Sequence, residues 1–330
     1  MFGVVVAAAA AAVVACTVVV VSGQDCIPGD NCKLPNCRCS NDPDIPGKLS
    51  RSDTPQMVLV TFEEAVNEDD VPLYESIFKQ GNPNGCPPRG TFFVKHKSTD
   101  YEIVRALFDK GHEFGAESIN GIVPTTEEEW RRNLKFVKDE LIKAGLPAED
   151  ILGVRAPNLM AGGLKEFVAL GDNKFLYDAS CITSTFIEQG NTKWPYTYDF
   201  VDDVPKCNIG TTLDVKFPGK WQFLIPVLNY KNSTCAVPQG CTTVLTQRDA
   251  FDMFFDNFSK HYEGTRAPFV LVISADFVKT DFKLAGLTQF LEYVRAAFED
   301  TWVVTARQAL QWVQDPTSNA NITDFGPWKC

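Results

Sequence analysis

The strongest constraint on the fold is an alternation of two sequence patterns from residue 57 onward. Short apolar runs typical of buried strands are separated by segments in which apolar residues recur at helical spacing. The expected strands cover residues 57–62, 91–95, 112–115, 151–154, 175–177, 268–273 and 302–305. The expected helices cover residues 71–79, 101–110, 126–144, 163–169, 249–261, 286–298 and 306–313. Strands that alternate with helices lie parallel and are joined by right-handed crossovers. The chain is therefore restricted to an open doubly wound sheet or a closed barrel.

Of these two folds, the pattern favours the barrel. No glycine-rich phosphate fingerprint follows the first expected strand, which argues against a dinucleotide-binding open sheet. The length of 330 residues suits an α/β fold built as a distorted (β/α) barrel of about seven units. We assign residues 56–330 to this domain, with an insertion at about 180–248 that breaks the alternation. In barrel enzymes the active site lies at the carboxyl ends of the strands.

The first 23 residues are expected to be a signal peptide. They hold a long run of Val and Ala and no charged side chain, and small residues precede a cleavage point before Gln24. A signal anchor is the alternative, because about 20 apolar residues can span a bilayer. A polar, cysteine-rich segment without a flanking basic cluster follows at once, which favours cleavage and no membrane attachment of the mature chain.

The cysteines point to an oxidising compartment. The chain has 11 Cys, and removal of Cys16 with the leader leaves an even number, compatible with five disulfides. Four of these cysteines lie in residues 24–55, which read as a disulfide-pinned lead-in. Zinc is the alternative for this cluster, although no His lies near it. Cys235 and Cys241 are close enough in sequence for a local bridge, and a partner for Cys330 would tie down the C-terminus.

The net charge excludes one class of partner, and three sequons mark possible glycosylation sites. The formal net charge of −11 would repel a phosphate backbone, so nucleic acid is excluded as a partner. Three Asn-x-Ser/Thr sequons, at Asn232, Asn257 and Asn321, are available for glycosylation if the chain is exported.

Polar residues stand at the ends of several expected strands. Thr61-Phe62-Glu63-Glu64-Ala65 closes the first strand, Arg155-Ala156-Pro157-Asn158-Leu159 ends another, and Asp178 follows a third. Together with Trp194-Pro195-Tyr196 and Leu271-Val272-Ile273-Ser274, this ordered set resembles the polysaccharide deacetylases of carbohydrate esterase family four. Within that family it is most similar to the chitin-deacetylase-like proteins of insects. The resemblance extends over nearly the whole mature chain, including the lead-in Cys32-Lys33-Leu34-Pro35-Asn36-Cys37 and the segment Phe217-Pro218-Gly219-Lys220-Trp221.

The resemblance implies a metal-dependent site, but five motif positions depart from the family pattern, and three of them lose a His. Family members hydrolyse an N-acetyl group with a metal-bound water, usually on zinc, an Asp base and a His acid. The base and the first metal ligand are here Glu63 and Glu64, each one methylene longer than the family's Asp. The two His ligands become Glu117 and Gly121, and the acid His becomes Ser274, which cannot act as an imidazolium-like acid near neutral pH. The three His of the chain, His96, His112 and His261, fall on other positions.

Other site residues are retained from the family pattern. The resemblance implies that Arg155 orients the base, that Asp178 lines the site, and that the remaining positions shape the substrate groove. These groove positions are Pro157, Leu159, Trp194, Tyr196 and Leu271.

The substitutions predict a secreted protein that binds chitin or a related N-acetylglucosamine polymer and whose zinc-hydrolase site is largely lost. A slow but active deacetylase that releases acetate is the alternative. The sequence predicts no tightly bound cofactor; carboxylates such as Glu64 and Glu117 suit weak binding of a hard divalent cation better than zinc. We further expect a monomer in an extracellular, chitin-containing matrix, with a gut lining as one setting.

Overall fold

The computed structural model describes residues 25–184 and 192–330. The expected signal peptide therefore lies outside the described residues. Within the described part of the chain, no helix is both long and apolar enough to cross a membrane.

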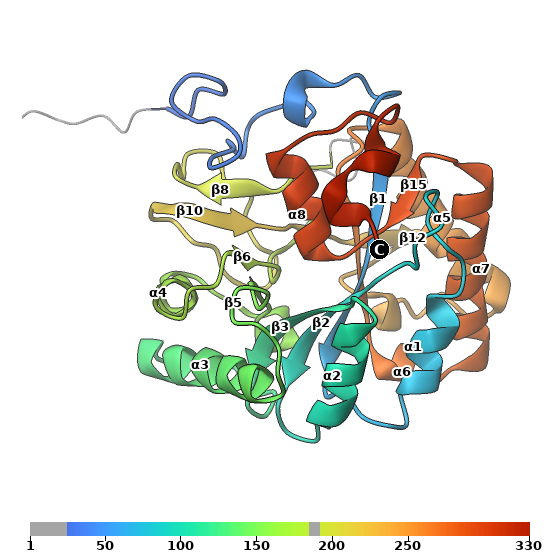
Figure 1. Ribbon diagram of the computed structural model, residues 1–330, viewed down its shortest axis with the longest axis horizontal. Coiled ribbons are helices and arrows are strands. Elements are labelled where there is room, and N and C mark those ends of the chain that lie inside the picture. The colour runs from blue at the N-terminus through green and yellow to red at the C-terminus, as the bar shows by residue number, and fades with distance from the viewer. Residues whose placement is uncertain (1–24, 185–191) are drawn as a thin grey trace, which may run out of the picture.

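One large sheet organises the domain (Figure 1). Its strands follow the order β14-β1-β2-β3-β4-β6-β10-β8, and β15 pairs with β1. All of these pairings are parallel except that of β10 with β8. The strand bounds are β1 (Gln56–Glu64), β2 (Thr91–Lys95), β3 (Glu113–Ser118), β4 (Gly153–Val154), β6 (Tyr177–Asp178), β8 (Tyr196–Tyr198), β10 (Phe217–Gln222), β14 (Phe269–Ile273) and β15 (Thr301–Val303). The predicted α/β fold with a parallel core is confirmed.

Helices lie on the outside of this sheet (Figure 1). Their bounds are α1 (Val71–Ile77), α2 (Tyr101–Asp109), α3 (Glu127–Lys143), α4 (Leu164–Asp172), α5 (Gln247–Glu263), α6 (Ala275–Val278), α7 (Asp281–Ala297) and α8 (Ala306–Gln314). Several begin with side-chain caps: at α3, Thr126 and Glu129 form a capping box that satisfies backbone N–H groups of the first turn.

The central strands are buried on both faces. Along β1, Val58, Val60 and Phe62 pack with the outer helices, whereas Met57 and Leu59 face a second cluster inside the sheet. Successive strand residues point to opposite faces, so a continuous apolar run such as that of β1 belongs to a strand covered on both sides. The short apolar runs that predicted the strands therefore reflect burial of these strands on both faces.

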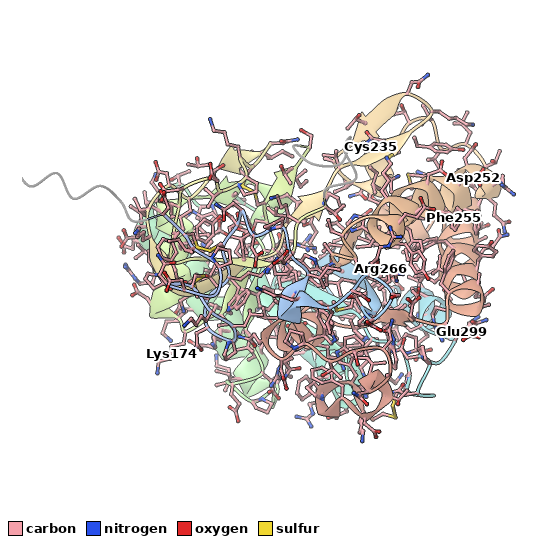
Figure 2. All side chains as sticks on the ribbon, turned by 90° about the horizontal axis from the view of Figure 1, so that it is seen from above. Lys174, Cys235, Asp252, Phe255, Arg266 and Glu299 are labelled. Carbon is pink, nitrogen blue, oxygen red and sulfur yellow. A yellow bond between two sulfur atoms is a disulfide. The ribbon has the colours of Figure 1, made fainter. Side chains whose placement is uncertain are left out.

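The segment at about 180–248 is partly built into the main sheet. Strands β8 and β10 extend the sheet beyond β6. The other strands of this region form small pairs: β7 (Ile182–Thr183) with β11 (Ile225–Pro226), and β12 (Leu228–Tyr230) with β13 (Ser233–Cys235). Strand β9 (Gly210–Thr211) pairs with β5 (Ala161–Gly162), which precedes the region. Figure 2 shows Cys235, in β13, at the edge of the molecule beyond Asp252 and Phe255 of α5.

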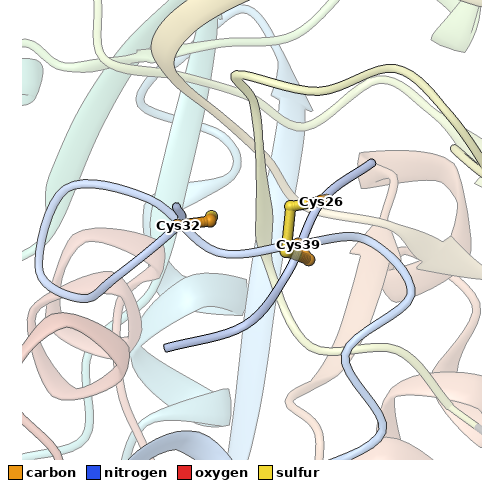
Figure 3. Close-up of side chains that lie close together, drawn as sticks. All are labelled: Cys26, Cys32 and Cys39. Carbon is orange, nitrogen blue, oxygen red and sulfur yellow. A yellow bond between two sulfur atoms is a disulfide. The ribbon is translucent and has the colours of Figure 1, made fainter. Parts of the chain in front are cut away.

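Five disulfides join the ten described cysteines. The lead-in holds Cys26–Cys39, whose bond Figure 3 shows beside Cys32, and Cys32–Cys37. All four sulfurs that zinc would need are therefore engaged in disulfides. Elsewhere the bridges are Cys86–Cys330, Cys181–Cys207 and Cys235–Cys241. The expected local bridge and the tie at Cys330 are confirmed. The lead-in itself docks on β8, where the N–H of Thr197 donates to the carbonyl of Arg38 and the N–H of Arg38 donates to Oγ1 of Thr197.

Candidate active site

The fold brings the predicted polar residues to one end of the sheet. Glu63 and Glu64 end β1, Glu117 and Ser118 end β3, Arg155 follows β4 and Asp178 ends β6. Ser274 follows β14, which is in register beside β1 with Phe62 opposite Ile273. Because these strands are parallel, their carboxyl ends share an edge, where barrel sites are built.

Arg155 is the fixed centre of this edge. Its side chain is fully buried, and its guanidinium donates to the carbonyl of Ala179 at 2.8 Å and to Oγ1 of Thr61 at 2.7 Å. The guanidinium also lies 4.3 Å from the centre of the Phe93 ring. Its Nε is 4.0 Å from Oε2 of Glu63. The expected pairing of Arg155 with the base position is therefore present, as a charge pair longer than a direct hydrogen bond.

The carboxyl groups at this edge hold their protons unusually tightly. Burial, opposed by the nearby Arg155, raises the pKa of Glu63 from 4.5 to about 7. Burial and the charge of Glu63 raise the pKa of Glu117 to about 8. Three buried atoms have no hydrogen-bond partner within residues 25–184 and 192–330: Oε2 of Glu63, Oε2 of Glu117 and Nη2 of Arg155. The centre of the site is thus polar but incompletely satisfied.

Glu64 and Ser274 serve a different purpose from that expected of a metal ligand and an acid. Oε2 of Glu64 accepts a hydrogen bond of 3.0 Å from the backbone N–H of Ala275, the first residue of α6. Ser274 is the N-cap of the same helix, and its Oγ accepts from the N–H of Phe277 at 3.1 Å. Both side chains satisfy N–H groups that a helix start leaves without partners.

The described residues do not fit zinc. The side chain of Glu117 reaches only Ser118 by a weak contact, and Gly121, with a φ of +79°, has no side chain to offer. His96, His112 and His261 bond instead to Tyr101, Gly90 and Ala267. Among residues 25–184 and 192–330, the only group of three or more potential ligand atoms within 4.8 Å of one another is Cys26, Cys32 and Cys39, and these are disulfide-bonded. A zinc site needs about three converging ligands.

Asp178 belongs to a buried network behind the edge. It accepts hydrogen bonds from the hydroxyl and the N–H of Ser180 and from Nε2 of Gln222. A second buried carboxyl, Glu166, was missed by the sequence analysis; it hydrogen-bonds Asp178 and accepts from the N–H of Gly162 at 2.7 Å. Burial raises the pKa of both carboxyls, and two neighbouring buried carboxylates cannot both ionise, so the pair retains a proton.

The predicted groove residues are all buried. Leu271 is inside the sheet at 1% exposure, and Pro157 and Leu159 lie in a short 3-10 turn after Arg155. Trp194 stacks on Trp312 with ring centres 5.4 Å apart, and its indole N–H donates to the carbonyl of Thr265.

Trp194 and Tyr196 therefore present no open ring to a sugar. Trp194 is 4% exposed and Tyr196 is fully buried. The structure places both in the core, and we do not count them among the surface contacts.

Exposed aliphatic side chains lie instead on the segments that follow β3 and β4, near Gly121 and Leu159 in the chain. We call Ile122, Met160 and Leu164 the aliphatic rim; they are 68%, 39% and 47% exposed. Their loops are tied together, because Nδ2 of Asn158 contacts the carbonyl of Gly121 at 3.5 Å and Nζ of Lys165 donates to the carbonyl of Thr125 at 2.8 Å. Single exposed apolar residues carry no sequence signal, so the rim was not predicted.

Comparison with known proteins identifies the family. The chain is 31% identical over 319 residues to chitin deacetylase 1 of Bombyx mori, covering 90% of this chain and 58% of that protein. It is 30% identical over 300 residues to chitin deacetylase 8 of Bombyx mori, covering 86% of this chain and 77% of that protein. The chain belongs to the chitin deacetylase family. The predicted resemblance is confirmed, although no profile of a known protein family matches the chain.

Solved structures support the fold of this family member. A Mycobacterium smegmatis protein assigned as a polysaccharide deacetylase aligns with a TM-score of 0.53 at 19% identity, over 82% of this chain and 94% of that one. The PuuE allantoinase aligns equally broadly, with a TM-score of 0.51 at 17% identity. Because an allantoinase shares the fold, the fold alone does not fix the reaction.

Proposed function

We propose that this chitin deacetylase family member binds chitin, or another polymer of N-acetylglucosamine, and is impaired in deacetylation. The main support for impaired deacetylation is that two side chains at catalytic positions of the family both cap the start of α6. Glu64 occupies a metal-ligand position of the family and Ser274 the position of its acid, yet both are engaged by backbone N–H groups. Glu117 and Gly121 supply no imidazole at the remaining ligand positions. Each missing group is expected to cost orders of magnitude in rate.

The polymer is proposed to lie across the edge formed by Glu63, Glu117 and the aliphatic rim. The rim offers apolar contact to acetyl methyl groups and sugar faces. Oε2 of Glu63 and Nη2 of Arg155 are buried and lack a hydrogen-bond partner among the described residues, so they would gain one from a polar group that reaches them. We further propose that the mature chain is secreted and extracellular, which its five disulfides support, and that it is a monomer.

A pull-down on insoluble chitin tests the binding. The parent protein is expected to sediment with chitin, and Ile122→Ser with Met160→Ser is expected to reduce the bound fraction severalfold. Leu245→Ser is the matched control, since Leu245 is 72% exposed at the start of α5, outside the rim. Failure of the parent protein to bind chitin would refute this function.

A slow deacetylase is the second candidate, and one observation favours it. The pKa of Glu63 near 7 is well placed for a general base at neutral pH. Acetate release from chitin oligomers, measured for the parent protein and for Glu63→Gln, distinguishes the two. Turnover that disappears in Glu63→Gln would replace the impaired-enzyme proposal; equal background release from both proteins supports it.

A further inference from the structure

A second polar cavity lies at the opposite end of the domain from the strand ends described above. We call it the basal cavity; it encloses about 310 Å³. Two elements fix its position. His112 directly precedes β3 and Glu113 begins it, whereas Glu117 lies at the other end of this strand, and Thr305 caps the start of α8. The lining residues that matter for ligand binding are Arg89, Gly111, His112, Glu113, Asp150 and Arg307. Nothing in the proposed polysaccharide binding uses this cavity.

Both carboxylates of the cavity already have partners. Asp150 forms an ion pair with the guanidinium of Arg307. Oε2 of Glu113 accepts from the hydroxyl of Thr91 at 2.9 Å and from the N–H of Arg307 at 2.8 Å. Oε1 of Glu113 accepts from the hydroxyl of Tyr177 at 2.7 Å. Within the described residues, neither acid forms an ion pair with another cation of the cavity.

Arg89 is that other cation, and it has no partner. It forms no hydrogen bond or ion pair within the part of the chain that the structure describes, and its Nε is buried. Gly111, at a φ of +91°, makes room for it, because a Cβ at this glycine would lie 2.5 Å from Nε of Arg89. A half-buried guanidinium without a counter-charge carries a desolvation cost that a bound anion would offset.

His112 adds a donor beside Arg89. The ring is 8% exposed, and its Nδ1 accepts a hydrogen bond of 3.0 Å from the N–H of Gly90. Burial and the charges of Arg89 and Lys110 lower the pKa of His112 to about 4, so the ring is neutral at pH 7 and carries its hydrogen on Nε2. No hydrogen bond from this Nε2–H is formed within the described residues.

We propose that the basal cavity binds a small oxyanion, a phosphate, sulfate or carboxylate group, with the Arg89 guanidinium as its main contact and the Nε2–H of His112 as a second donor. Guanidinium groups bind such oxyanions through paired, charge-assisted hydrogen bonds. The Arg307–Asp150 pair closes the wall of the cavity and remains an internal pair when the anion is bound.

Titration calorimetry with inorganic phosphate at pH 7 and constant ionic strength tests this site. The parent protein is expected to bind phosphate saturably, and Arg89→Gln to weaken binding at least about tenfold, the loss of one charge-assisted contact. Lys110→Gln is the matched control: it removes a nearby cation that is exposed and paired with Glu75, and binding is expected to persist. Absence of saturable binding in the parent, or an equal loss in both variants, overturns the proposal. Parallel titrations with sulfate and acetate separate tetrahedral anions from carboxylates.

A second readout does not depend on the folding of any variant. The chain has only 3 His, so the ring signals of His112 can be followed by NMR in the parent protein. Phosphate is expected to shift the His112 signals while leaving those of His96 and His261 in place. Unmoved His112 signals at saturating phosphate would also overturn the proposal. Because chitin is absent from both measurements, their outcome is independent of the polysaccharide-binding proposal.

Discussion

Replacement of Glu117 by Gln should stabilise the protein at alkaline pH and not at acidic pH. The folded state holds the Glu117 proton up to about pH 8, whereas the unfolded chain releases it near 4.5. Between these values the folded state binds more protons than the unfolded state, so stability is greatest below pH 4.5 and falls as the pH rises through the folded pKa. In Glu117→Gln no proton is released at this position, and this loss of stability should disappear.

The size of the effect follows from the pKa. A rise from 4.5 to about 8 corresponds to at most about 5 kcal/mol of unfolding free energy at pH 9, of which we expect a few kcal/mol after the fold relaxes. Urea unfolding of parent and variant at pH 5 and pH 9, with a chelator present to keep cations from the carboxylates, measures the difference directly.

The control for this experiment is Glu128→Gln, on the exposed surface of α3. It removes the same charge without the burial that raises the pKa of Glu117, and its effect should be small and equal at both pH values. If Glu117→Gln gains no more stability at pH 9 than at pH 5, the account of a buried, unsatisfied carboxyl at this edge is wrong.

Three further predictions follow from the packing. Ser274→Ala removes the cap that the N–H of Phe277 uses, and thermal unfolding should show a loss of about 1 kcal/mol. Trp194→Ala should lower the free energy of unfolding by about 3–5 kcal/mol, because the indole is a core side chain. The folded variant should keep its affinity in a chitin pull-down. Weaker binding at unchanged stability would show that Trp194 is a surface contact after all. Mass spectrometry of protein secreted from insect cells should find a glycan on Asn232, which lies at an exposed hairpin turn. Asn257 should carry none, because its buried amide donates to the carbonyls of Asn229 and Met253. A glycan on Asn257 would contradict this burial.

The fold was more predictable than the site, because strands and helices follow from local sequence patterns whereas the site depends on contacts between residues far apart in the chain. The apolar run of β1 and the helical spacing of apolar residues in α3 are local patterns, and they predicted a strand and a helix at the observed places. The family resemblance then placed Glu63, Arg155 and Asp178 at the strand ends, which the structure brings to one edge.

Burial and tertiary hydrogen bonds were not readable from the chain. An aromatic at a groove position, such as Trp194, has the same sequence appearance whether it faces solvent or stacks on Trp312. Likewise, Glu64 and Ala275 are 211 residues apart, and only the pairing of β1 with β14 reveals that one caps the helix of the other. Glu166 was missed for the same reason, since its partner Asp178 lies on a different element.

The bridge between Cys86 and Cys330 sets an order for oxidative folding. Its two cysteines are 244 residues apart, whereas the other four bridges close within 26 residues. At typical translation speeds Cys86 therefore waits on the order of tens of seconds for its partner. During that interval Cys181, Cys207, Cys235 and Cys241 emerge from the ribosome and must pair with one another rather than with Cys86. If the short bridges close first, the thiol of Cys86 has no free thiol among these four to mispair with. The long bridge can form only after synthesis reaches Cys330.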